Sequence, residues 1–268
     1  MKKLFLFSLC FVIVIGKLSA QDNTNDSKFR FGLKMAPAFA WMKPDDKKKL
    51  TNDGVALKFA YGLVTEFRIN SVASLSTGIE VNYSGGRMNF ANQADSNYYD
   101  PSEYTVPKAG TIDRFFISKR NYKITYVDLP ILLKMKTPEV NGFTYFGQFG
   151  INLSVRAKVK ANDVGTLVTY RDSSSYFKRV NTINDYEIPD LIITKDMSFF
   201  RAGLNIGGGA EYRIAGNTSM FASVNFQNGF TNVLKAESKV IRSQTKNNQN
   251  FLQNAKTNFF QLNVGILF

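Results

Sequence analysis

The stretch FRFGLKMAPAFAW, residues 29–41, alternates large apolar residues with small or charged ones, and it decides the fold. One face of a strand drawn through these 13 residues carries Phe29, Phe31, Leu33, Met35, Phe39 and Trp41. A period of two predicts a β-strand, and strands of soluble proteins usually have about 5–6 residues. At about 3.3 Å per residue and a tilt of about 45°, this longer strand crosses the hydrocarbon core of a membrane. The stretch therefore predicts a transmembrane β-strand.

The same alternation recurs seven times along the chain. The segments are 55–69, 75–83, 122–136, 143–155, 200–214, 220–227 and 260–268. Segment 122–136 is less regular, and Pro130, which cannot donate to a strand ladder, predicts a β-bulge there. Short connections alternate with long polar ones (43–53, 87–121, 160–197 and 229–256), as in outer-membrane barrels with short periplasmic turns and long outer loops. The sequence therefore predicts an all-β fold, an eight-stranded antiparallel up-and-down transmembrane β-barrel over residues 28–268.

Aromatic residues gather at both ends of the predicted strands, where a membrane barrel has its interfacial girdles. They are Trp41, Tyr83, Phe200 and Phe260 at the loop end, and Phe67, Phe143, Tyr145 and Tyr212 at the turn end. A soluble lipocalin-like barrel or a β-sandwich is the alternative, but both turn their apolar face inward and use shorter strands. Here the face opposite the apolar one carries bulky charges and glycines, which favours a polar lumen with lipid outside.

The N-terminus has the pattern of a secretory signal peptide. Lys2 and Lys3 precede an apolar run over residues 4–16, and small residues end at Ala20. The run is shorter than the roughly 20 residues of a spanning helix, so we expect cleavage after Ala20 rather than a membrane anchor. Residues 1–20 are then the signal peptide and residues 21–27 a short periplasmic tail. An exported protein without a second hydrophobic helix is periplasmic, secreted or an outer-membrane barrel, and the alternating strands predict location in the outer membrane.

The composition excludes several kinds of chemistry. The chain has no His and a single Cys, Cys10, which lies within the predicted signal peptide. Without His there is no Ser-His-Asp or Cys-His arrangement and no His-ligated zinc, and barrel enzymes generally use a histidine as general base. Without Cys in the mature chain there are no disulfides and no iron–sulfur ligands. We therefore expect a protein that is not an enzyme and has neither cofactor nor metal site.

Charged residues on the inward face form two candidate groups in a chain with 34 Lys+Arg against 21 Asp+Glu. The candidate lumen network is Arg30, Lys34, Glu66, Arg68, Glu80, Asp128, Lys134, Glu211 and Arg213. The candidate basic vestibule, near the outer mouth, is Lys58, Arg156, Lys158 and Arg201. An eight-stranded barrel is just wide enough for side chains to fill, so both groups have a structural interpretation as a hydrogen-bonded filling and a solvated rim. The alternative is a vestibule that binds or transports an anion, such as a lipopolysaccharide phosphate or an acidic glycan.

Several stretches resemble the PorT-like family of small outer-membrane β-barrels. The stretch YVDLPILLK, residues 126–134, matches the family's pattern of tyrosine, acid, proline, aliphatic residues and lysine on the fourth strand. Residues 62–86, 143–150 and 206–229 also match it. The resemblance implies the barrel fold. Since the founding member is implicated in a protein secretion system of gliding and pathogenic Gram-negative bacteria, it also implies a role as an accessory of such a system.

The expected partners follow from the location and from the resemblance. They are outer-membrane lipid and lipopolysaccharide, the outer-membrane insertion machinery, and an envelope protein. The insertion machinery would recognise the C-terminal strand, which ends on the aromatic residue Phe268. Nucleic acid is not expected for an exported barrel. The first functional hypothesis is a structural or interaction role in the envelope, and the second is the anion- or glycan-binding vestibule.

Overall fold

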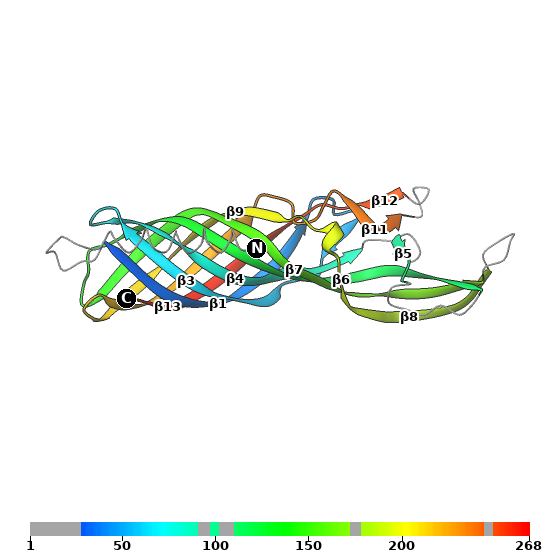
Figure 1. Ribbon diagram of the computed structural model, residues 1–268, viewed down its shortest axis with the longest axis horizontal. Helices are drawn as coiled ribbons and strands as arrows, with labels where there is room; N and C mark the ends of the chain where they lie inside the picture. The colour runs from blue at the N-terminus through cyan, green and yellow to red at the C-terminus, as the bar shows by residue number, and fades with distance from the viewer. Residues whose placement is uncertain (1–27, 91–96, 102–109, 172–177, 244–248) are drawn as a thin grey trace, which may run out of the picture.

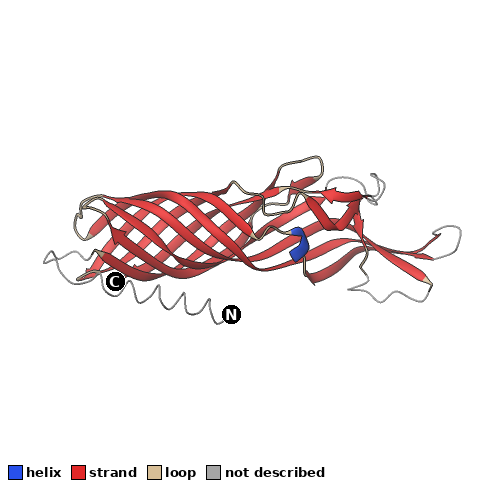
Figure 2. Ribbon diagram, turned by 45° about the horizontal axis from the view of Figure 1, so that its top comes forward, coloured by secondary structure: helices blue, strands red, loops and turns tan. Residues whose placement is uncertain are grey.

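The computed structural model describes residues 28–90, 97–101, 110–171, 178–243 and 249–268. This part of the chain is almost entirely β-structure, with one short 3₁₀ turn, η1 (Thr194–Asp196), where the barrel meets its outer extension (Figures 1 and 2). None of its helices has the length and apolar character needed to span a membrane. The predicted signal peptide, residues 1–20, and the predicted tail, residues 21–27, lie outside the described residues and stay predictions.

Eight antiparallel strands close into a ring, each paired with the next one around the barrel. They are β1 (Phe29–Pro44), β3 (Ala56–Arg68), β4 (Ala73–Phe90), β6 (Thr111–Lys136), β7 (Phe143–Arg171), β9 (Phe200–Ala215), β10 (Thr218–Gly229) and β13 (Ala255–Leu267). Pairing of β13 with β1 closes the barrel, with Leu33 facing Ile266. The predicted eight-stranded antiparallel barrel is confirmed.

The outer face of the barrel carries the apolar residues of the alternating pattern. Leu57 is 71% exposed and Ile206 52% exposed, values that suit side chains in contact with lipid rather than with a core. At the loop end the ring of Trp41 lies 5.8 Å from that of Phe260, and at the turn end Phe143 lies 4.8 Å from Tyr212. The apolar belt therefore ends in aromatic side chains on both sides, as the sequence predicts.

The bulge expected at Pro130 is not there. Thr77 faces Ile131 and Glu80 faces Asp128, so β4 and β6 keep one register on both sides of the proline. The Pro130 carbonyl accepts a hydrogen bond of 2.7 Å from the Thr77 hydroxyl, which adds a side-chain link between β4 and β6 at the proline. The irregular alternation in the sequence has another cause, since Leu132 faces inward and is buried.

The long outer connections contain ordered strands, contrary to the expectation of polar loops. Strands β6 and β7 have 26 and 29 residues and continue well past the barrel (Figure 1). Five further strands pair with β4, β6, β7 or one another: β2 (Leu50–Asn52), β5 (Asn97–Tyr99), β8 (Lys178–Leu191), β11 (Glu237–Ser243) and β12 (Gln249–Leu252). We call this extension the outer sheet. Sequence periodicity missed it because register shifts interrupt the alternation.

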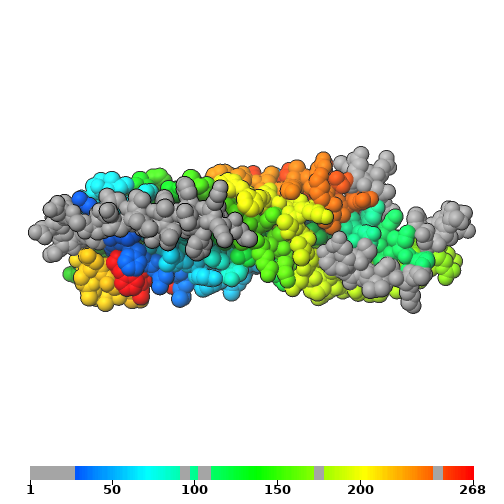
Figure 3. Space-filling view, in the orientation of Figure 1, coloured from blue at the N-terminus to red at the C-terminus, as the bar shows by residue number. Residues whose placement is uncertain are grey.

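A hydrophobic core lies inside the outer end of the molecule. Its fully buried members include Met42, Met88, Phe115, Tyr122, Ala161, Val233 and Ile241. Residues distant in sequence meet here: Met197, just after η1, bridges to Leu234. Figure 3 shows the segments near residues 200 (yellow) and 240 (orange) packed together on this part of the surface. The outer sheet therefore has an apolar interior, unlike the barrel below it.

Candidate functional site

A compact group of ion pairs fills the lumen at the turn end, and we call it the charged layer. Two glutamates from opposite walls, Glu66 on β3 and Glu211 on β9, share three cations. Arg30 lies 3.1 Å from Glu66 and 2.7 Å from Glu211. Lys134 contacts both glutamates, at 3.1 Å for Glu66, and Lys136 also contacts both, at 3.2 Å for Glu211. The group therefore joins strands β1, β3, β6 and β9 across the lumen.

The sequence named four members of the charged layer and missed Lys136. This lysine lies two residues after Lys134 on the same strand, so period-two counting places it on the same inward face. The other predicted basic residues at this end lie outside the layer. Arg213 is paired with Glu139 at 2.7 Å on the exposed rim, and Arg68 donates through Nε to the Asn70 carbonyl at 3.2 Å.

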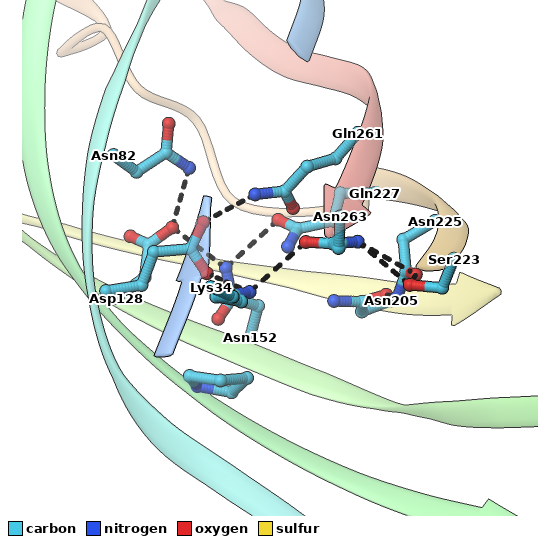
Figure 4. Close-up of polar contacts among 12 residues, drawn as sticks. Lys34, Asn82, Asp128, Asn152, Asn205, Ser223, Asn225, Gln227, Gln261 and Asn263 are labelled. Carbon is cyan, nitrogen blue, oxygen red and sulfur yellow. Dashed lines mark hydrogen bonds and ion pairs between the residues drawn. The ribbon is translucent and has the colours of Figure 1, made fainter. Parts of the chain in front are cut away.

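Side-chain amides and one further ion pair fill the middle of the lumen (Figure 4). Lys34 on β1 pairs with Glu80 on β4 and donates to the Asn263 side chain at 3.3 Å. The Gln261 amide donates to Glu80, and the Asn263 amide donates to Asn225 at 3.2 Å. Four strands are linked in this way, so the mid-lumen is a hydrogen-bonded filling rather than free water space.

Asp128 is the centre of a second group of polar contacts, which lies in the lumen closer to the outer end of the barrel. It accepts hydrogen bonds from Asn82 at 2.8 Å and from Asn152 at 3.0 Å (Figure 4), and it pairs with Arg201 at 3.2 Å. The Arg201 guanidinium also lies 4.1 Å from the centre of the Tyr126 ring, a cation–π contact. Arg201 is 3% exposed, so it belongs to the lumen filling and not to the open vestibule that the sequence suggested.

The other vestibule candidates do not gather around an opening either. Arg156 donates through Nη1 to the carbonyls of Thr194 and Met197, at 3.1 and 2.8 Å, and so fixes η1 to the barrel mouth. Lys158 is exposed beside the buried Val159, because a register shift near residue 157 changes which face points inward. Lys58 is half-buried on β3. Sequence counting assumed an unbroken alternation, and the shift invalidates it at this point.

Above Asp128 the apolar core described above closes the lumen, and one buried ion pair lies within it. Arg120 donates to Asp163 from Nε at 2.7 Å and from Nη2 at 2.6 Å, and the Tyr99 hydroxyl donates to the same carboxylate at 2.9 Å. The Arg120 guanidinium also lies 5.9 Å from the centre of the neighbouring Tyr122 ring. Sequence analysis could not predict this pair, since both residues lie in segments expected to be loops.

A cleft of about 820 Å³ lies on the outer sheet, between β5, β6, β8 and β11. Its lining combines aromatic residues with charges, including Tyr98, Asp100, Arg114, Asp190, Lys239 and Arg242. The Arg114 guanidinium lies 4.8 Å from the centre of the Tyr98 ring. We call this the outer cleft. No group of three or more metal-binding side chains occurs in the part of the chain that the structure describes.

An antiparallel barrel with an apolar outer face and a lumen filled by polar side chains defines a membrane-spanning β-barrel of the bacterial outer-membrane type. The family model described as "Outer membrane protein beta-barrel domain" matches residues 19–235, and the chain belongs to this family. The protein is therefore located in the outer membrane, as the sequence predicted. A comparison with curated protein sequences found no significant match.

Several solved outer-membrane proteins are similar to this chain. Neisserial surface protein A has a TM-score of 0.38 at 12% identity, with 90% of this chain and 96% of that chain covered. Ail, the attachment invasion locus protein of Yersinia pestis, has a TM-score of 0.35 at 11% identity, covering 90% and 100%. OprG from Pseudomonas aeruginosa has a TM-score of 0.38 at 12% identity, covering 91% and 98%.

Proposed function

We propose that this protein is a non-catalytic interaction barrel of the outer membrane, which presents the outer sheet to a partner in the cell envelope. The observation that carries the proposal is the contrast between a filled lumen and a large ordered extension. The charged layer, the amides around Lys34 and the apolar core occupy the lumen one after another. A barrel with a filled lumen is better suited to hold the outer sheet as a binding platform than to conduct ions as a pore.

The β7–β8 hairpin is the part of the platform best suited to contact a partner. Most residues of β8 are exposed, and Val180 and Ile183 are apolar residues with 44% and 42% of their surface exposed. Among the described residues β8 pairs only with β7, so its other edge offers backbone groups to a further strand. Strand addition at this edge would let an envelope protein dock on the hairpin.

The resemblance to PorT-like barrels supports an envelope partner, and it favours an accessory role in a protein secretion system. The other partners expected from the sequence are part of the same proposal. Lipid and lipopolysaccharide surround the apolar belt, and the insertion machinery recognises the strand that ends at Phe268. The absence of histidine from the whole chain supports a role without general acid–base catalysis by imidazole.

Conductance in planar bilayers tests the filled lumen. We expect no steady current, because ion passage would require opening three successive layers of packed side chains. A steady open pore in the folded protein contradicts the proposal.

Docking is tested separately by cross-linking in native outer membrane, comparing the wild type with a variant in which Val180→Asp and Ile183→Asp are combined. We expect the wild-type cross-links to be lost in the variant, and unchanged cross-links would exclude the hairpin as the docking element.

A second candidate function is binding of an acidic glycan, and the outer cleft favours it. The basic residues proposed for a vestibule do not gather around an opening, but Arg114, Lys239 and Arg242 line the cleft beside Tyr98. Aromatic faces and basic groups together suit sugar rings that carry carboxylates. Titration with a uronic-acid oligosaccharide tests this function. A variant combining Lys239→Gln and Arg242→Gln should bind at least tenfold more weakly, whereas Lys178→Gln, on β8 outside the cleft, should bind as the wild type does.

A further inference from the structure

The charged layer opens on a cavity at the turn end of the barrel. The cavity has a volume of about 190 Å³, far above the roughly 10–15 Å³ that one water needs. Arg30, Glu66, Lys136 and Glu211 line its inner part. Turn residues, among them Asn70 and Asn217, line its mouth. The cavity therefore connects buried charges with the space on the turn side, which in outer-membrane barrels is the periplasm.

The described side chains of the charged layer are not balanced in charge. Arg30, Lys134 and Lys136 supply three positive charges, and Glu66 and Glu211 supply two negative ones. The side chains of all five are at most 15% exposed. A buried charge without a counter-charge is unfavourable, because the low-dielectric interior does not replace its hydration. An anion in the adjoining cavity would remove this imbalance.

Aromatic residues lie behind the charged layer. The Lys134 ammonium lies 4.0 Å from the centre of the Phe146 ring and 5.9 Å from that of Phe221. These two rings pack with Leu267 into a small apolar cluster, with Val64 against it. The void beside these rings measures only about 30 Å³, so the charged layer backs onto packed side chains, as in a binding site and unlike an open channel.

The rim carries charged residues of both signs. Arg68, Arg213 and Glu139 line the mouth, and Arg213 pairs with Glu139 at 2.7 Å. The excess positive charge that bears on the cavity therefore lies in the charged layer, where it favours the entry of anions.

We propose that this cavity is a binding site for a small carboxylate anion presented from the periplasmic side. One carboxylate matches the single excess charge of the inner layer. Arg30 and Lys136 are placed to hold it, because both cations belong to the charged layer and also line the cavity. The cavity lies at the other end of the barrel from the outer sheet, so this proposal can be tested independently of the function proposed above.

The substitution Lys136→Gln provides the direct test. It leaves Arg30 and Lys134 against Glu66 and Glu211, two charges of each sign, so it removes the excess without leaving a carboxylate unpaired. The probe is sodium acetate, titrated by calorimetry into the folded protein in detergent, in a chloride-free HEPES buffer at constant ionic strength. We expect acetate binding by the wild type and at least a tenfold loss of affinity in the variant. Lys58→Gln, a lysine variant at the other end of the barrel, should bind acetate as the wild type does.

A second variant tests the same site by filling it. Ser219 is buried and lines the cavity, so Ser219→Asp places a carboxylate inside it. We expect this variant to fold, as judged by heat-modifiable migration, to unfold at a higher temperature and to have lost acetate binding. Absence of acetate binding by the wild type, or equal binding by the wild type and Lys136→Gln, overturns the proposal. Tighter binding of inorganic phosphate than of acetate by the wild type overturns the assignment to a carboxylate.

Discussion

The barrel wall and the outer sheet share two strands, β6 and β7, but they arrange polar and apolar side chains in opposite ways. In the wall, Leu129 and Ile131 of β6 point to lipid while Asp128 is 1% exposed in the lumen. In the outer sheet, Phe115 of the same strand is fully buried and Lys119 is exposed. One strand therefore reverses its pattern along its length. The comparison teaches that the surroundings decide which face is apolar: lipid outside the wall, water outside the sheet.

The reversal occurs where the pairing of β6 with β7 shifts. One shift lies between Ile117 and Lys119 and another between Thr125 and Tyr126. A shift of one residue moves a set of side chains to the other face, because the side-chain period of a strand is two. The two regions are thus joined by irregularities that let a single pair of strands serve a lipid-facing and a water-facing structure.

Breaking the buried ion pair of the outer sheet should have the largest effect. Asp163→Ala leaves the fully buried Arg120 without its carboxylate, and removing one partner of a buried pair typically costs about 3–5 kcal/mol. We expect the outer sheet to open while the barrel stays closed. Hydrogen exchange should show loss of protection in β8 and β11, and heat-modifiable migration should be unchanged.

A double variant distinguishes the unpaired charge from lost packing. Arg120→Met combined with Asp163→Leu removes both charges and keeps apolar volume in the core. Since apolar replacements of buried pairs are often neutral or stabilising, we expect protection in the outer sheet to recover. A double variant as unprotected as Asp163→Ala would show that the unpaired charge of Arg120 is not what opens the outer sheet.

A charge on the outward face should have the second-largest effect on stability, and this effect should differ between the barrel wall and the outer sheet. Ile206→Arg places a guanidinium on the lipid face of β9, where such substitutions cost about 2–4 kcal/mol at the membrane midplane. Ile183→Arg on the outer sheet meets water instead, and a surface substitution there should change stability by less than about 0.5 kcal/mol. Urea unfolding of both variants in lipid vesicles measures the difference. Equal effects would contradict the assignment of one face to lipid and the other to water.

Periodicity predicted the wall well and the outer sheet poorly, for a physical reason. Within the wall each strand keeps one face in lipid, so residues 29–41 show the pattern without interruption. In the outer sheet, residues such as Phe115 and Asp163 are buried through pairings between segments far apart in sequence. These pairings include register shifts, and no local pattern encodes them. The prediction therefore treated an ordered, apolar-cored sheet as polar loops.

The same limit applied to the candidate site residues. Counting inward positions named Arg30, Glu66, Lys134 and Glu211, which meet in one cluster. It placed Arg201 at an open mouth, because it could not show that Tyr126 and the core above it cover that depth. The depth of a residue in the barrel can be counted along its strand from the sequence. Whether that residue is buried depends on other segments of the chain, which the count does not include.

Titration of Asp190 should give the smallest effect, confined to the end of β8. Asp190 lies 3.1 Å from Lys160 and 3.5 Å from Lys123, and the hydrogen bond from Lys160 lowers the pKa of its carboxyl group. A lowered pKa in the folded state contributes stability above the unfolded value of about 3.9, and this contribution is lost as the pH falls through the folded value. The contact of β8 with β7 should therefore be weakened only in acid.

Two lysine variants test the origin of this shift by NMR titration of the Asp190 side-chain carbonyl. In Lys160→Gln we expect the midpoint to rise toward the unperturbed value. In Lys123→Gln the rise should be smaller, since this lysine is farther away and contributes less to the shift. Because all three groups lie at the boundary where β7 leaves the wall, the titration also reports whether β8 stays paired there. Equal midpoints in the wild type and Lys160→Gln would mean that β8 does not hold Asp190 against β7 in solution, and that the pairing of β8 with β7 stops farther from the barrel than Leu191.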